Sequence, residues 1–254
     1  MHRFFAEKRA ENLLYLAKED IKHFKDVLRI KDDEEVEVYI DGTGYIAVLN
    51  SYSKNELSLK IISEIKEKYE SELKISLFQS LVKSDKMDFI IQKAIEMGVY
   101  SIVPIETKRS IVKKKDIKDK KLERYKNIAK AAAMQSKREF IPSVSDAMKL
   151  DEAKEILDGF DLVLIAYEDE LDNSIKNYDI KDKKNIAIVV GPEGGFDMSE
   201  IEELKKFGYK SISLGKRILR AETAPIALLT MLYYEFNGSG LLWWRFMYKI
   251  WAAK

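Results

Sequence analysis

Two glycine-containing loops follow short apolar runs near the C-terminal end of the sequence. The first run, Ile186–Val190, is followed by the letters GPEGGF, and the second, Ser211–Leu214, is followed by GKRILRAETA. Short β-branched runs that stop at glycine predict buried strands with abrupt ends. Glycine also lets a ligand approach main-chain N–H and C=O groups closely. The first loop can therefore bind through its backbone, whereas the second, with Lys216, Arg217 and Arg220, can bind through charge.

The residue types exclude several other kinds of site. The 254 residues include no cysteine and only two histidines. Disulfides, cysteine nucleophiles and thiolate metal sites are therefore excluded, and we expect no metal. Neither GxGxxG after a strand nor GxxxxGK[ST] occurs, which disfavours a Rossmann dehydrogenase, a common class I methyltransferase and a P-loop NTPase. The absence of a signal peptide and of an 18-residue apolar run predicts a cytoplasmic protein without a membrane span.

Charge is distributed unevenly along a chain whose net charge is only +1. Residues 1–72 carry 12 Lys and Arg against 16 Asp and Glu, residues 73–150 carry 18 against 9, and residues 151–254 carry 14 against 18. The middle segment therefore holds the whole positive excess. A local basic face fits a polyanionic partner such as RNA, although a solvated lysine-rich surface would give the same composition.

The elements that must position these loops fall into two patterns. Residues 1–72 predict a small β-rich unit, with strands at RFF and LLYL, one helix at Glu19–Arg29 and a hairpin that turns at Asp41–Gly42. Beyond this point strands and helices alternate, which is typical of an α/β fold with parallel strands. We expect strands at 75–81, 101–105, 161–166, 186–190 and 211–214, and helices at 85–97, 122–138 and 224–236. Ligands of such sheets bind beyond the carboxyl ends of the strands.

The two loop motifs, in this order, resemble the RsmE family of 16S rRNA (uracil-N(3))-methyltransferases of the SPOUT superfamily. The segments KMDFIIQKAIEMGV and MQSKREFIP also match that family, except that Met134 stands where the family usually has glutamate. The resemblance implies an S-adenosylmethionine-dependent homodimer that methylates uridine N3 in 16S rRNA of the small ribosomal subunit. It also implies an α/β fold with a SPOUT-type parallel sheet and a C-terminal trefoil knot, preceded by a small PUA-like β-barrel.

The expected domains follow from the change of pattern and from the resemblance. Residues 1–72 form the PUA-like RNA-binding domain, residues 73–237 form the methyltransferase domain, and residues 238–254 are an unassigned aromatic tail.

The resemblance, together with the chemistry of the loops, assigns the candidate site residues. The cofactor is expected to contact Gly191, Pro192, Glu193, Gly194, Gly195, Leu214, Gly215, Leu219, Thr223 and Ala166. Uracil N3 carries a proton, so methylation needs a proton acceptor and groups that stabilise the resulting anion. Arginine cannot accept a proton at ordinary pH, so Arg220 and Arg217 are assigned to RNA phosphate or to the uracil anion. Glu222 and Glu193 are both candidates for the base.

Seven further side chains are expected to contact RNA. They are Arg3, Arg29, Lys83, Lys86, Arg109, Gln135 and Arg138. Two alternatives remain open at this stage: a methyltransferase of the same fold that acts on another RNA site, and a non-catalytic RNA-binding protein. The intact GPEGG and LRAET motifs disfavour the second alternative.

Overall fold

The computed structural model describes residues 1–236, which form two compact units. The first unit contains Met1–Glu70 and Lys130–Ile141, and the second contains residues 71–129 and 142–236. This division differs from a single boundary at residue 72, because Lys130–Ile141 groups with the N-terminal strands. The expected aromatic tail at 238–254 lies outside the described residues.

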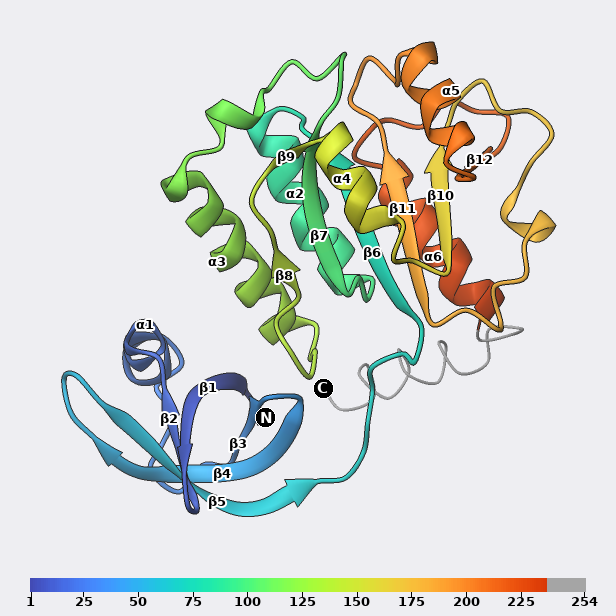
Figure 1. Cartoon of the computed structure of the whole chain (residues 1–254). Helices are drawn as coiled ribbons and strands as arrows, with labels where there is room; N and C mark the ends of the chain where they lie inside the picture. The colour runs from blue at the N-terminus through green and yellow to red at the C-terminus, as the bar shows by residue number, and fades with distance from the viewer. Residues whose placement is uncertain (237–254) are drawn as a thin grey trace. The chain divides into compact units, whose positions relative to one another are not determined.

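The first unit is built on a closed barrel with the strand order β1-β2-β5-β4-β3 (Figure 1). Its strands are β1 (Arg3–Ala10), β2 (Leu13–Leu16), β3 (Val36–Ile40), β4 (Thr43–Tyr52) and β5 (Leu57–Ile65). Alternate residues such as Val36 and Val38 point into the barrel and are fully buried, as a period of two requires. The expected hairpin is confirmed: Asp41 and Gly42 both have positive φ, at 49° and 76°, which suits a tight turn between antiparallel strands.

The expected helix at Glu19–Arg29 is present as two short pieces. They are the α-helix α1 (Lys18–Lys22) and a π-helical turn, η1 (His23–Val27). Phe24 is fully buried, and its ring centroid lies 5.2 Å from that of Phe4 in the barrel core. Burial of these aromatic rings fixes the helix on the barrel.

Segment Lys130–Ile141 belongs to the first unit because it makes specific contacts there. Met134, near the end of helix α3 (Asp119–Gln135), packs against the apolar barrel core, as its flexible thioether side chain allows. Arg3 is only 5% exposed. Its guanidinium pairs with Glu37 and donates to the carbonyl oxygens of Lys137 and Arg138.

The second unit contains a parallel sheet with the order β12-β10-β11-β6-β7-β8, and β9 also pairs with β7. The strands are β6 (Lys74–Ser80), β7 (Ser101–Glu106), β8 (Ser143–Val144), β9 (Met148–Lys149), β10 (Leu162–Ala166), β11 (Asn185–Val190) and β12 (Lys210–Ile212). The five expected strands are all confirmed, whereas β8, β9 and the helix α4 (Leu150–Leu157) were not predicted. Two-residue strands are too short to show a periodic pattern.

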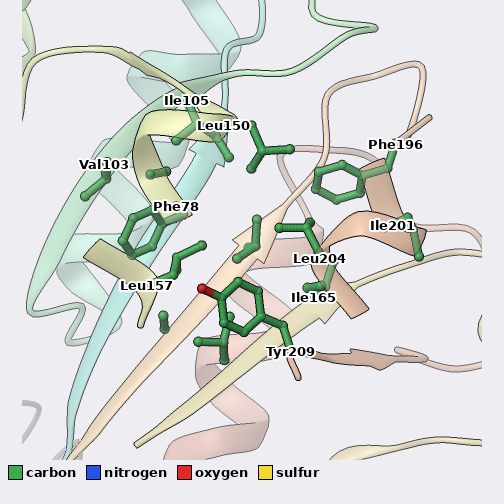
Figure 2. Packing of buried hydrophobic residues seen from close by; sticks show 14 residues of the cluster. Phe78, Val103, Ile105, Leu150, Leu157, Ile165, Phe196, Ile201, Leu204 and Tyr209 are labelled. Atoms are coloured by element: carbon green, nitrogen blue, oxygen red, sulfur yellow. The ribbon is translucent and has the colours of Figure 1, made fainter. Parts of the chain in front are cut away.

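Helices cover both faces of this sheet, which explains why its strands are continuously apolar. On one face, side chains such as Phe78, Val103 and Ile165 form a core with α4 and with α5 (Met198–Lys206), as Figure 2 shows. On the other face lie α2 (Ser84–Glu96) and α6 (Ala224–Phe236), which contact each other, and α6 also packs on β6 and β11. These helices confirm the predicted ones at 85–97 and 224–236.

The chain returns from the edge strand β12 to the middle of the sheet, where α6 packs on β11 and β6. Such a return is what a C-terminal trefoil knot requires, and the knot itself stays a prediction from the resemblance. Although α6 is strongly apolar, it has only 13 residues. Within residues 1–236, no helix combines the length and apolar character needed to cross a membrane.

Replacement of Arg3 by methionine should destabilise the barrel, because it leaves Glu37 and two buried carbonyl oxygens without their donor. We expect a loss of about 3 kcal/mol in the free energy of unfolding, measured by urea denaturation. Arg29→Met is the matched control, since Arg29 is exposed and its replacement should change the free energy by less than about 0.5 kcal/mol. Unchanged stability of Arg3→Met together with weaker RNA binding would restore the phosphate role expected for Arg3.

Candidate functional site

Three neighbouring strands of the parallel sheet end at one edge. Ala166 of β10 is paired with Val190 of β11, and Val190 is paired with Gln79 of β6. The loops that follow β10 and β11, and the segment after the edge strand β12, therefore leave the sheet close together. This is the position at which parallel α/β sheets bind ligands.

The glycine loop, residues 191–196, is tightly packed after β11. A hydrogen bond of 3.0 Å from the N–H of Gly195 to the carbonyl oxygen of Pro192 closes it. Gly195 has a φ of +67°, and a side chain there would also overlap the carboxylate of Glu168. At Gly191 a Cβ atom would lie 3.1 Å from the buried ring of Phe196. The glycines at these two positions are therefore required by the backbone and by close neighbours.

The end of the glycine loop is fixed by the cap of α5. The Asp197 carboxylate accepts a hydrogen bond of 3.2 Å from the N–H of Ser199, and Glu200 Oε2 accepts one of 3.0 Å from the N–H of Asp197. The D-x-x-E pattern at 197–200 is that of a capping box. Glu200 is 4% exposed, and its Oε1 atom also accepts from the N–H of Lys108, at 2.8 Å. Glu200 thus ties the loop after β7 to the loop after β11.

Arg109 lies on the glycine loop. Its guanidinium donates to the carbonyl oxygen of Gly194, at 3.2 Å, and contacts the carboxylate of Asp197, at 3.3 Å. Hydrogen bonds from Ser199 and the nearby Arg109 charge hold the pKa of Asp197 below its ordinary value. Arg109 therefore helps to hold the glycine loop, and its contact with RNA stays a prediction.

The segment after β12 carries the second motif and leads into α6. The N–H of Ser213 donates to the carbonyl oxygen of Asn173, at 2.8 Å, which joins this segment to the loop after β10. The carbonyl oxygen of Arg220 accepts from the N–H groups of Thr223 and Ala224, at 2.9 and 3.0 Å. The LRAET motif therefore forms the turn that starts the helix.

The two motifs converge on a pair of adjoining cavities. The larger has a volume of about 330 Å³ and the smaller about 80 Å³, and they share lining residues from the loops after β10 and β12. The larger is lined by Lys86, Ala166, Glu168, Val190, Gly191, Pro192, Glu193, Gly195, Ile218, Leu219, Arg220, Ala221 and Ala224. The smaller adds Tyr167, Ser213, Leu214, Gly215, Lys216 and Arg217.

Most of the residues expected to hold a cofactor lie along these walls. Gly194 and Thr223 are absent from both, and their backbone groups instead hold Arg109 and the turn before α6. Glu168 and Ile218 each line both cavities. Ile218 was not predicted as a site residue, because an isolated apolar residue in a loop belongs to no periodic pattern or motif.

Three charged residues of the larger cavity wall, Lys86, Glu193 and Arg220, form ion pairs that include a fourth residue, Glu222, which lines neither cavity. Lys86 Nζ lies 3.3 Å from Glu193 Oε1 and 3.4 Å from Glu222 Oε2, and Arg220 lies 3.9 Å from the other Glu222 oxygen. Partial burial lowers the pKa of Lys86, but the two carboxylates outweigh this effect and leave the pKa above its ordinary value. Lys86 was expected to contact RNA; the structure instead pairs it with two acidic groups of the loops.

The other predicted RNA contacts divide into buried and exposed groups. Arg3 and Arg138 are 5% and 6% exposed, and Arg138 Nε donates to Glu70, at 2.7 Å. Their predicted role on RNA phosphate is corrected, because their guanidinium groups are engaged inside the first unit. The side chains of Arg29, Lys83 and Gln135 are exposed.

Metal chemistry finds no support in the described part of the chain. Among residues 1–236, no group of three or more histidine, cysteine, aspartate and glutamate side chains could hold a metal ion.

Comparison with known proteins accounts for both units. The RNA methyltransferase domain family matches residues 69–233, and the RNA methyltransferase PUA domain family matches residues 16–62. Ribosomal RNA small subunit methyltransferase E of Mesomycoplasma hyopneumoniae (strain 232) is 37% identical over 231 residues, which cover 91% of this chain and 98% of that protein. The protein of the same name from Bacillus subtilis (strain 168) is 32% identical over 249 residues, with 92% and 97% covered.

Solved structures agree with the sequence relatives. A ribosomal RNA small subunit methyltransferase E from Neisseria gonorrhoeae, bound to S-adenosylmethionine, has a TM-score of 0.79 and 30% identity, with 91% of this chain and 96% of that chain covered. A methyltransferase from Legionella pneumophila, also with bound S-adenosylmethionine, has a TM-score of 0.83 and 31% identity over the same shares.

Glu170 gives a pH-dependent test of the loop after β10. Burial acts to raise its pKa, but hydrogen bonds from the Ser211 hydroxyl and from the N–H groups of Asp172 and Asn173 outweigh burial and hold the pKa below its ordinary value. A depressed carboxyl pKa stabilises the fold at neutral pH, and this stabilisation is lost as the pH falls through the folded-state pKa.

Glu170→Gln should therefore lower the free energy of unfolding by about 1–3 kcal/mol at pH 7, and the deficit should shrink as the pH falls below about 4.5. Thermal unfolding over a pH series measures this. The exposed Glu155, replaced by glutamine in the same way, should show no deficit at either pH. A deficit for Glu170→Gln that stays constant down to pH 3 would contradict the assignment.

Proposed function

This chain belongs to the ribosomal RNA small subunit methyltransferase E family, and on that basis we propose that it transfers a methyl group from S-adenosylmethionine to N3 of a uridine in 16S rRNA. The observation that carries the proposal is the convergence of the GPEGG and LRAET segments on one cavity that also holds carboxylate and guanidinium groups. A protein that only bound RNA would need no such cavity.

The cavity suits S-adenosylmethionine in size and in chemistry. A volume of about 330 Å³ falls within the usual range for small-molecule sites. The main chain of Gly191 and Gly215 is open to a ligand, as recognition of an adenine ring through backbone groups needs. The Leu219 side chain forms an apolar part of the cavity wall, and the Glu168 carboxylate complements a cationic ligand. When bound, the cofactor supplies an electrophilic methyl group on a sulfonium that leaves as a neutral thioether.

The protein must supply a proton acceptor and a stabiliser of the uracil anion. Glu222 fits the first role, since a carboxylate can accept the N3 proton and its side chain pairs with Lys86 and Arg220, which line the cavity. Arg220 fits the second role, because its side chain is 83% exposed beside the cavity, with its guanidinium 3.9 Å from Glu222. The N3 lone pair then forms the new N–C bond while the C–S bond breaks toward sulfur. Arg217, on the smaller cavity, remains a candidate for RNA phosphate.

RNA recognition is assigned to both units. The PUA family match covers most of the barrel, and Arg29 and Gln135 expose side chains that can contact phosphate or base. In the second unit Lys83 is exposed at the start of α2. We further propose that the protein acts as a homodimer in the cytoplasm, where small ribosomal subunits are found, and that α6 contributes its exposed Met231 and Tyr234 to the dimer surface.

Gly195→Ala should weaken S-adenosylmethionine binding roughly tenfold or more, because the new Cβ atom displaces the Glu168 carboxylate that lines the cavity. Isothermal titration measures the dissociation constant. Gly208→Ala is a matched control: Gly208 has a φ of +87°, but nothing lies within 4 Å of an added Cβ. Equal affinity for both variants would show that the close approach at Gly195 does not shape the site.

Arg220→Ala should lower the rate of RNA methylation about 100-fold or more while S-adenosylmethionine still binds. The measurement combines isothermal titration with mass mapping of nucleosides in small-subunit RNA treated with the purified protein. Absence of cofactor binding by the unaltered chain would favour a non-catalytic RNA-binding protein. Methylation at another atom or in another RNA would replace uridine N3 as the target, and full activity of Arg220→Ala would remove the arginine role.

A further inference from the structure

One ammonium group joins three separate chain segments at the larger cavity. Lys86 is the third residue of α2, Glu193 belongs to the glycine loop, and Glu222 lies in the turn before α6. The Lys86 Nζ atom contacts both carboxylates, at 3.3 and 3.4 Å. The three side chains are only 26%, 22% and 18% exposed, so water screens their charges incompletely.

The two carboxylates need this cation. Like charges that share a partly buried site each disfavour ionisation of the other. The other charged side chains facing the cavity are Glu168, which adds to the negative charge, and Arg220. Arg220 is 83% exposed and its contact with Glu222 is 3.9 Å long, so solvent weakens its influence. Lys86 is therefore the main counter-ion of Glu222.

Neither of the simpler roles for Lys86 fits these contacts. Its raised pKa keeps it charged at neutral pH, so it cannot accept the uracil proton. An RNA phosphate would have to compete with two carboxylates that already neutralise the ammonium group.

We propose that Lys86 is a positioning residue for methyl transfer: its ammonium group holds the Glu222 carboxylate beside the cavity and holds the glycine loop through Glu193. This inference rests on the proposed function and adds a residue to it. In the step concerned, the N3 proton passes to a Glu222 oxygen, the N3 lone pair forms the bond to the methyl carbon, and the C–S electron pair leaves with sulfur. Without the ammonium group, the Glu222 carboxylate keeps only the 3.9 Å contact with the exposed Arg220, so it is less well placed to accept the uracil proton.

Lys86→Met tests the proposal in the full chain. We expect kcat for methylation of small-subunit RNA to fall about 100-fold, as for loss of a proton acceptor. The dissociation constant for S-adenosylmethionine should change far less, because Arg109 and Glu200 still hold the glycine loop. Lys86→Arg, which keeps the charge and can still pair with both carboxylates, should recover most of the rate.

Lys93→Met is the control on the same helix, since the Lys93 ammonium group pairs with Glu96 and lies outside the cavity. It should leave kcat unchanged. Equal loss in Lys86→Met and Lys86→Arg, or a loss in Lys86→Met that comes from weaker cofactor binding alone, would overturn the positioning role. If the unaltered chain methylates no uridine N3, the proposed function fails; if it does so and Lys86→Met matches it, only the Lys86 inference fails.

Discussion

The site depends on one constraint: a parallel sheet that is covered by helices on both faces is accessible to a ligand only at the ends of its strands. Core side chains and helices fill both faces of the sheet, so ligands have no access there. Because Ala166, Val190 and Gln79 are in register, the loops after three strands must share one small region. The cofactor cavity and the charged cluster both form there, from residues that are more than 100 positions apart in the sequence.

Apolar periodicity was enough to predict the framework. The runs at 75–81 and 186–190 are strands and the pattern at 224–236 is a helix, since buried elements have strong local patterns. Of the loop glycines expected to contact a cofactor, Gly191, Gly195 and Gly215 line the cavities. The grouping of Lys130–Ile141 with the N-terminal unit could not be predicted. The helix continues without a break, so its sequence has no local sign that the last turn packs against a barrel.

Charged side chains were the least predictable part of the site. Arg109, Lys86 and Arg3 were all expected to contact RNA, yet each is engaged by carboxylates or carbonyl oxygens from distant segments. A lysine or arginine has the same local pattern whether it faces solvent or a buried acid, so composition reveals the excess of charge but not the partners. Glu222 was selected from the sequence because it belongs to the LRAET motif, whereas its pairing with Lys86 is visible only in the structure.

The anchored glycine loop has a thermodynamic consequence. Arg109 fixes the Gly194 carbonyl, Glu200 fixes the N–H of Asp197, and Phe196 is buried beneath Gly191. The chain has therefore lost most of the loop's conformational entropy during folding, before any ligand arrives. Association then carries little further ordering cost in this loop, and differences in affinity among ligands will reflect the contacts that they make rather than how much backbone they must organise.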